Sequence, residues 1–212
     1  CVTFSDTRLN WFRNRLVHTG NPVRTEFLSA DAKRGKAYIG KNGGNILLIL
    51  GGSQGSETIN KIVRETLEEL SHHFLVVHIC GPGKKVESNL ENYVQFEFVR
   101  KEMADLLAAA DLVVSRAGSN SLFEIIAMKK PNILIPLGLS SSRGDQILNA
   151  RYAKEKGWSS VITEERLTSE TFLQELLLLN KNSNVYLENL SRIEPKEAVE
   201  RIITEIECLQ KN

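Results

Sequence analysis

Two glycine-punctuated turns constrain the fold of this chain more than any other feature of its sequence. The first is GGSQG at residues 51–55, directly after an apolar run at 46–50, and the second is SRAGS at 115–119, after an apolar run at 112–114. Each turn directly precedes a helix-like pattern. Buried strand, tight turn and helix N-terminus together bind anions, because unpaired N–H groups and the helix dipole attract phosphate. The two turns therefore predict a parallel α/β fold with a phosphate-binding edge.

Neither turn matches an established phosphate-binding motif. Both lack the GxGxxG spacing of dinucleotide-binding folds and the GxxxxGK[ST] spacing of P-loop proteins. One such turn is weak evidence for phosphate binding. Two turns within one regular pattern of strands and helices are stronger evidence.

Strand-like and helix-like segments alternate from residue 46 onward. We expect strands at 46–50, 74–80, 94–99, 112–115, 132–136 and 160–162, and helices at 57–70, 103–110, 121–128, 145–156, 168–179 and 196–209. This alternation is typical of a parallel sheet that helices cover on both faces. The predicted fold class is α/β, a Rossmann-like doubly wound parallel sheet of six strands.

Composition narrows the classes of function. The 212 residues are 42% hydrophobic and 25% charged, which is typical of a globular domain with one substantial core. A net charge of +1 creates no field that would recruit nucleic acid, so we expect no nucleic-acid partner. No apolar run approaches the roughly 20 residues that span a bilayer. Any membrane association is therefore expected to be peripheral.

Cysteine and histidine usage gives little sign of metal or nucleophile chemistry. Cys1, Cys80 and Cys208 are odd in number, far apart and without CxxC spacing, which favours a reducing, cytoplasmic compartment. His78 and Cys80 share one strand face, but they lie in an apolar run without further ligands, which favours packing over zinc binding. No pattern of a Ser/His/Asp nucleophile or of paired hydrolase carboxylates stands out.

The first 44 residues do not fit the alternating unit. The chain begins with Cys1 rather than Met, and residues 1–20 are expected to be the end of a preceding domain. We expect residues 21–44 to be an interdomain linker, residues 45–195 the ligand-binding domain and residues 196–212 a C-terminal helix.

Polar side chains gather where the strands are predicted to end. Those beside the two turns are Ser53, Gln54, Ser56, Ser119, Asn120 and Ser121. Ligands of doubly wound sheets bind beyond the carboxyl ends of the strands. For each residue alone, an ordinary helix cap is the more common role. Their convergence at strand ends favours a shared ligand.

Two further positions could contact a polyhydroxylated ligand. Glu124 is expected in the first turn of the helix after the second glycine turn, where a carboxylate either binds ribose hydroxyls or complements the helix dipole. Asp145 and Gln146 open the helix after a Ser-rich loop, and their acceptor and amide groups suit a sugar. For Asp145 alone, an N-cap is the more common role.

Four motifs occur together in a specific order: GNPVR at residues 20–24, GGSQG at 51–55, SRAG at 115–118 with Glu124 downstream, and Asp145-Gln146 with Asn149-Ala150. Their order and spacing resemble the C-terminal half of MurG-type N-acetylglucosaminyltransferases. The resemblance covers essentially the whole chain, and GGSQG combined with GNPVR is its most specific part.

The resemblance implies a GT-B fold of two Rossmann-like domains, of which this chain would be the C-terminal, donor-binding one. The family transfers GlcNAc from UDP-GlcNAc to a lipid-linked muramoyl-pentapeptide, converting lipid I to lipid II with inversion, at the inner face of the bacterial plasma membrane. It implies no cofactor and no obligatory metal. The general base is expected in the N-terminal domain, so the isolated chain is expected to transfer little or no sugar.

The resemblance also implies a role for each matched residue. Arg24 compensates phosphate charge, Glu124 accepts from the ribose hydroxyls, and Val99 with Arg100 frames the uracil. Gln146, beside Asp145, contacts the GlcNAc hydroxyls. The groups implied to approach the diphosphate or sugar belong to Gly52, Ser53, Gln54, Gly55, Ser119, Asn120 and Ser121.

This sequence departs from the family at two places. Asp145 replaces a Gln or His found in many members and follows an unusual loop at residues 140–143, and the segment at 99–102 is one residue longer than in some members. Two alternatives stay open: a GT-B paralogue with a different acceptor, and a noncatalytic nucleotide-sugar-binding subunit. A nonenzymatic α/β domain is a further alternative, which the polar residues at the strand ends disfavour.

Overall fold

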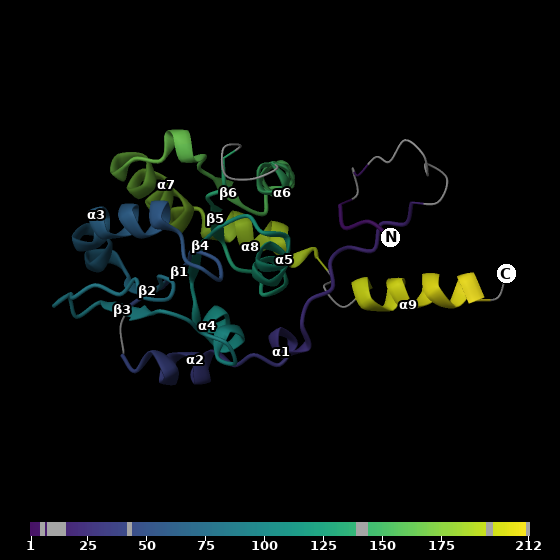
Figure 1. Cartoon of the computed structure of the whole chain (residues 1–212), viewed down its shortest axis with the longest axis horizontal. Helices are drawn as coiled ribbons and strands as arrows, with labels where there is room; N and C mark the ends of the chain where they lie inside the picture. Colours follow the sequence, from purple (N-terminus) through teal and green to yellow (C-terminus); the bar gives the residue numbers. More distant parts are fainter. Residues whose placement is uncertain (5–6, 8–15, 42–43, 139–143, 194–196, 211–212) are drawn as a thin grey trace.

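The fold is a six-stranded parallel sheet with helices on both faces, as Figure 1 shows. The computed structural model describes residues 1–4, 7, 16–41, 44–138, 144–193 and 197–210. The strands are β1 (Ile46–Leu50), β2 (Leu75–Ile79), β3 (Tyr93–Phe96), β4 (Leu112–Ser115), β5 (Asn132–Leu134) and β6 (Ser160–Val161). Their order is β3-β2-β1-β4-β5-β6, and every neighbouring pair is parallel. The predicted doubly wound α/β fold is confirmed.

Helices connect the strands and cover the sheet. They are α1 (Thr25–Leu28), α2 (Ala32–Ile39), α3 (Glu57–His73), α4 (Met103–Ala109), α5 (Ser119–Ala127), α6 (Asp145–Glu155), α7 (Ser169–Lys181), α8 (Ser183–Ser191) and α9 (Glu197–Gln210), with a 3-10 turn η2 at Glu164–Arg166. The predicted helix at 121–128 begins two residues earlier than expected, and the predicted strand at 94–99 ends at Phe96. The helix α8 was not predicted.

Alternation along the central strand divides the core between the two faces. Leu47 and Ile49 of β1 pack with α3 and α7 in one apolar cluster. Ile46 and Leu48 point to the other face and pack with α4 and with Phe27 of α1. Side chains of a strand alternate between faces, and a parallel sheet is buried on both. The continuous apolar runs of the sequence therefore correspond to strands covered on two sides.

The segment expected as a linker packs partly onto the domain. Phe27 and Ile39 belong to the same buried cluster as α4. Gly35 of α2 lies so close to α4 that a Cβ added there would be 2.1 Å from the Asp105 carbonyl oxygen. Arg34 also bonds both Asp105 carboxylate oxygens at 2.8 Å. This part of the chain is thus anchored on the sheet domain through α4.

The two ends of the chain lie on the same side of the sheet domain (Figure 1). Val2 and His18 form an isolated parallel bridge, and Arg201 of α9 donates to the His18 carbonyl at 3.5 Å. The sequence also predicts a short helix at residues 6–12, and almost all of that range lies outside the described residues. Helix α9 extends away from the sheet and exposes apolar side chains, including Ile206 and Leu209.

Candidate functional site

The two glycine turns lie side by side at the carboxyl edge of the sheet. Strands β1 and β4 are neighbours, and their last residues, Leu50 and Ser115, are paired in register. A cavity of about 400 Å³ lies between the turns. Its lining includes Gly52, Ser53, Gln54, Gly55, Arg116, Gly118, Ser121 and Gln146. The structure therefore brings together residues that are far apart in the sequence.

The N-terminus of α5 opens at this cavity. Its N-cap is Gly118, which has no side chain to cap the first turn. Ser121 lines the cavity, whereas Ser119 and Asn120 lie in the same turn without lining it. Asn120 instead accepts a hydrogen bond from Asn21 at 3.4 Å. Unpaired first-turn amides and the helix dipole favour an anion at this point.

Ser56, expected beside a ligand, has a structural role. It is the N-cap of α3, where its hydroxyl accepts from the Ile59 N–H at 3.3 Å, and it is buried. The same hydroxyl accepts from Arg116 Nη2 at 2.6 Å. Its hydrogen-bonding capacity is therefore largely used within the protein.

A second cavity of about 450 Å³ adjoins the first. The two cavities share lining from Gly51, Gly52, Ser53 and Ser121. The second is also lined by Phe27 of α1 and by Val99 and Arg100, which follow β3. Arg100 lies over the Phe98 ring at 5.2 Å. Because the predicted strand ends at Phe96, these residues belong to a loop.

Glu124 lies in this second cavity and is bound by Arg24. Because α5 begins at Ser119, Glu124 is in the second turn of the helix, and the expectation of the first turn was wrong. Arg24 Nε donates to Glu124 Oε1 at 2.8 Å, and Arg24 Nη1 donates to Glu26 at 3.0 Å. The hydrogen bond to Glu124 is the main reason that the pKa of Arg24 is raised. Arg24 therefore contacts Glu124, the carboxylate that we predict binds the ribose.

Helix α6 begins differently from the expectation. Its N-cap is Gly144, so Asp145 is the first helical residue and not the cap. Gln146 lines the turn cavity, and its Oε1 accepts from the Leu137 N–H at 3.1 Å. Asp145 is exposed and is not part of that lining. The Ser-rich loop between them and β5, residues 139–143, lies outside the described residues.

Arg116 is a central residue of the site that the sequence did not single out. Its side chain is buried, with Nη2 donating to Ser56 and to Glu164 Oε1 at 2.7 Å, and Nη1 donating to the Ile135 carbonyl at 3.1 Å. Glu164 in turn accepts from the Gly138 N–H at 3.0 Å. Arg116 thus joins the segments that follow β1, β4, β5 and β6.

The charge of Glu164 is stabilised by this network. Burial by itself raises the pKa of Glu164, but the hydrogen bonds from Gly138, Arg116 and Thr58 and the positive charge of Arg116 more than offset that effect. The pKa therefore lies below its ordinary value, and the ion pair with Arg116 is intact at neutral pH.

A family model that matches most of the chain identifies the family. A model of the glycosyltransferase family 28 C-terminal domain matches residues 46–206. The chain belongs to this family. The matched range contains both glycine turns, Glu124 and Gln146, whereas Arg24 lies before it.

Curated relatives are similar over nearly the whole chain. A Clostridium botulinum (strain Loch Maree / Type A3) protein named UDP-N-acetylglucosamine--N-acetylmuramyl-(pentapeptide) pyrophosphoryl-undecaprenol N-acetylglucosamine transferase is 45% identical over 206 residues, covering 95% of this chain and 58% of the relative. A protein of the same name from Clostridium tetani (strain Massachusetts / E88) is 41% identical over 210 residues, covering 98% of this chain and 59% of the relative. The chain thus spans less than two thirds of the length of these relatives.

Solved glycosyltransferases share the fold. Acinetobacter baumannii MurG aligns with a TM-score of 0.68 at 19% identity, over 95% of this chain and 59% of that one. The calicheamicin glycosyltransferase CalG4 aligns with a TM-score of 0.65 at 17% identity, over 93% of this chain and 47% of that one. The two TM-scores show a common fold. Within the described ranges, no helix of this family 28 domain is long and apolar enough to cross a membrane.

A buried polar network lies next to the first glycine turn of the family 28 domain, at the end of β2. His78 in β2 contacts the Tyr93 hydroxyl through Nδ1 and Asn60 Oδ1 through Nε2, both at 2.9 Å. Asn60 donates to the Cys80 carbonyl at 2.8 Å. Burial, followed by the charge of Arg64, lowers the pKa of His78 to about 4. His78 therefore packs as a neutral ring.

The site residues that the sequence analysis did not identify differ in how clearly the sequence indicates their position. Arg116 directly follows a buried strand and stands within a glycine turn, which marks it as a residue at the ligand edge. Its partner Glu164 is 48 positions later, and no local pattern pairs the two. Phe27 and Glu26, which line the second cavity, lie in the expected linker. Only the packing of α1 on the sheet domain brings them to the site.

Proposed function

We propose that this family 28 domain is the donor-binding part of an inverting glycosyltransferase that moves GlcNAc from UDP-GlcNAc to lipid-linked muramoyl-pentapeptide, converting lipid I to lipid II in bacterial peptidoglycan synthesis. The observation that carries the proposal is the continuity of two cavities. One lies between the glycine turns at the start of α5, and the other contains the Glu124 carboxylate. The names of the curated relatives supply the donor and acceptor.

In this proposal the diphosphate lies where the two cavities meet. Ser53 and Ser121 line both of them, and the N-terminus of α5 is adjacent. Backbone N–H groups of the turns and of α5 would bind the phosphate oxygens. When the sugar leaves UDP, negative charge develops on the diphosphate, and preorganised donors stabilise it. The turns would therefore contribute to leaving-group departure as well as to binding.

The nucleoside would occupy the second cavity. Glu124 would accept hydrogen bonds from the ribose hydroxyls, because an ionised carboxylate has several acceptor sites and Arg24 Nε uses Oε1. Uracil would lie against Val99 and Arg100. In this arrangement Arg24 holds the Glu124 carboxylate in place. We also propose that Arg24 compensates part of the negative charge of the diphosphate.

The sugar would lie toward α6. Gln146 contributes an amide to the turn cavity, and its Oε1 already accepts from Leu137, which leaves the NH₂ group to face a hydroxyl. Asp145 is one residue further out on the exposed side. We therefore assign direct sugar contact to Gln146 and treat Asp145 as the neighbouring acceptor.

The proposal assigns the remaining functions to the part of the relatives that this chain does not span. Acceptor binding, the general base and contact with the inner face of the plasma membrane would belong there. Residues 1–20 would complete that domain and residues 21–44 would connect it, with 45–195 as the donor domain and 196–212 as a C-terminal helix. No step in this proposal needs a cofactor or a metal, and the isolated chain would transfer little or no sugar.

Calorimetric titration of the chain with UDP, UDP-GlcNAc, UDP-glucose and 2′-deoxy-UDP tests the donor assignment. We expect Glu124→Gln to weaken UDP binding by about tenfold or more, because a hydrogen bond to a charged group is lost. Binding of 2′-deoxy-UDP should be weak in both proteins and change less. Glu188→Gln is the matched control, since Glu188 is exposed on α8.

Two results would contradict the donor assignment. The first is a chain that is folded but does not bind UDP at millimolar concentration. The second is a Glu124→Gln variant that binds UDP as tightly as the unchanged chain does, which would remove Glu124 from the ribose site.

A further inference from the structure

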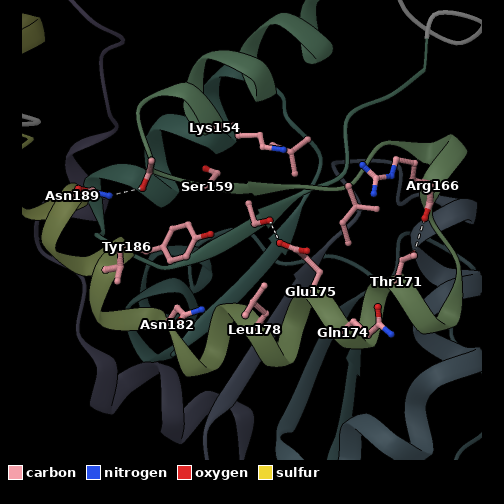
Figure 2. Close-up of a pocket in the computed structure, with 15 residues that line it drawn as sticks. Lys154, Ser159, Arg166, Thr171, Gln174, Glu175, Leu178, Asn182, Tyr186 and Asn189 are labelled. Atoms are coloured by element: carbon pink, nitrogen blue, oxygen red, sulfur yellow. Dashed lines mark hydrogen bonds between the residues drawn. The ribbon is translucent and has the colours of Figure 1, made fainter.

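A groove runs along the outer edge of the sheet, apart from the candidate donor site. Strand β6 is the last strand in the sheet order. Figure 2 shows the cavity beside it, of about 740 Å³, bounded by α7, α8 and the end of α6. We call this cavity the β6 groove. It shares no lining residue with the two cavities at the glycine turns.

An acidic side chain without a cationic partner lies at the centre of the β6 groove. Ser160 Oγ of β6 donates a hydrogen bond to Glu175 Oε1 of α7. The Tyr186 hydroxyl points toward Glu175 (Figure 2), and burial followed by the charge of Glu175 raises the pKa of Tyr186. In the part of the chain that the structure describes, no cation lies within ion-pairing distance of Glu175, and its Oε2 accepts no hydrogen bond. The groove thus offers a free acceptor beside a neutral tyrosine hydroxyl.

A second polar group in the β6 groove lacks a partner. The side chain of Ser159 is only 2% exposed, and its Oγ has no hydrogen-bond partner among the described residues. A buried hydroxyl without a partner costs free energy, so such groups usually bind water or a ligand. Ser159 lines the groove next to Ser160, so a ligand in the groove lies close to this hydroxyl, which has almost no accessible surface of its own.

Two cations also line the β6 groove. Lys154 of α6 and Arg166 of η2 both lie across the groove from Glu175 in Figure 2, and neither has an ion-pair partner within the described ranges. A cationic ligand would bind Glu175 but be repelled by both of these side chains. An anionic ligand would bind these two cationic side chains but be repelled by Glu175. A neutral hydroxyl avoids both, because it can donate to a carboxylate and accept from an ammonium or guanidinium.

The rim of the β6 groove adds an apolar surface. Leu178 of α7 is 51% exposed and Val185 of α8 is 59% exposed, and both line the groove beside the Tyr186 ring. Apolar and aromatic side chains next to a few convergent polar groups are typical of small-molecule sites. A pyranose ring presents C–H groups on its faces and hydroxyls at its edge, which matches this combination.

From these contacts we propose that the β6 groove is a binding site for a neutral saccharide, separate from the nucleotide-sugar site. The ligand's hydroxyls donate to Glu175, accept from Lys154 or Arg166, and bond the Ser159 hydroxyl. One ring face packs on Leu178 and Val185. The site involves no group transfer and does not depend on the proposed activity.

NMR titration of the ¹⁵N-labelled chain, with UDP present to occupy the candidate donor site, tests this proposal. The neutral probes are maltose and N,N′-diacetylchitobiose, and the charged probes are glucosamine, glucuronate and the zwitterion glycylglycine. We expect millimolar binding of a neutral probe, with shifts confined to residues that line the β6 groove. Glu175→Gln should weaken it by about tenfold and Ser159→Ala by about fivefold. Glu188→Gln, which makes the same change outside the groove, should not alter it.

Three results would overturn the proposal: no groove shifts with either neutral saccharide, binding that is the same in Glu175→Gln and Ser159→Ala as in the unchanged chain, or tighter binding of a charged or zwitterionic probe than of both saccharides. Dispersed spectra of the variants show whether they are folded, and Ser159→Ala serves as the test if Glu175→Gln does not fold. Groove shifts are read from residues that do not line the donor cavities. A failure of UDP binding would therefore overturn the proposed function without deciding this one.

Discussion

The two glycine turns look alike in sequence, but different interactions hold them in place. At Gly55 the φ angle is 70°, and an added Cβ would lie 2.0 Å from the Cys80 carbonyl oxygen. At Gly118 the φ angle is −64°, and an added Cβ would meet nothing within 4 Å. The first turn requires glycine for its own backbone contact. The second turn has no such requirement.

A side chain stabilises the second turn. Arg116 reaches from it to Ser56, Ile135 and Glu164, and so connects it to three other segments. The comparison shows that a glycine in a turn of this kind serves one of two purposes. It either permits the fold, as at Gly55, or leaves open space beside the backbone, in which we propose that a ligand lies. Gly118 fits the second purpose.

Gly55→Ala is expected to have the largest effect. The added methyl collides with the Cys80 carbonyl and places alanine at positive φ, so the free energy of unfolding should fall by more than about 3 kcal/mol. Gly118→Ala is the matched substitution, and its stability should change by less than about 0.5 kcal/mol. Urea unfolding followed by circular dichroism measures both, and calorimetry should show weaker UDP-GlcNAc binding by Gly118→Ala.

Equal losses of stability in the two alanine variants would contradict the distinction between the turns. A Gly118→Ala variant with unchanged stability and unchanged UDP-GlcNAc affinity would keep the structural half of the distinction and remove the ligand half.

Arg116→Ala should have the next largest effect, because it removes the bonds that hold the second turn. Glu164 and Ser56 would lose a partner, and the free energy of unfolding should fall by about 3 kcal/mol. Arg192→Ala is the control, since its ion pair with Glu188 is exposed and should contribute less than about 1 kcal/mol. A double-mutant cycle with Glu164→Gln isolates the pair. A coupling energy near zero would show that Arg116 acts through its other bonds.

The smallest of the three effects is a loss of stability in acid, which we expect from His78 next to the first turn. The pKa of His78 is lowered from 6.5 to about 4, so between these pH values the unfolded chain binds more protons than the folded one. The contribution of His78 is complete above pH 6.5 and is lost as the pH falls toward 4, by about 2 to 3 kcal/mol.

Urea unfolding at pH 7.5 and at pH 5 tests the acid effect. His78→Gln should lose less stability between the two pH values than the unchanged chain does. His72→Gln should behave like the unchanged chain, because His72 is exposed at the end of α3. The same pH dependence in all three proteins would assign the acid effect to carboxylates instead.

Much of the fold could be predicted because its signals are local. The central strands β1, β2 and β4 are short, mainly apolar runs that are buried almost throughout, and the alternation of strands with helices predicted a doubly wound sheet. Helix α8 was missed because its pattern directly continues that of α7, with a break at Asn182. Helices α1 and α2 were missed because their stability depends on packing against α4 rather than on a strong pattern of their own.

The candidate site could be predicted in part. The turns lie at the carboxyl ends of strands, so Ser53, Gln54 and Ser121 were expected near one another, and they line joined cavities. The pairing of Arg24 with Glu124 spans 100 positions and depends on where α1 docks. The cap of α6 was misassigned because Asp145 and Gly144 are both good N-caps, and only the backbone conformation distinguishes them.

By itself the sequence determined the class of fold, the edge of the sheet where we propose that a ligand binds and the two turns at that edge. These follow from apolar periodicity and from backbone geometry, which act over a few residues. Tertiary structure alone decided which turn needs its glycine, which charges are paired and where the β6 groove lies. Each of these depends on the distance between atoms that are far apart along the chain, and that distance is set by packing the helices on the sheet.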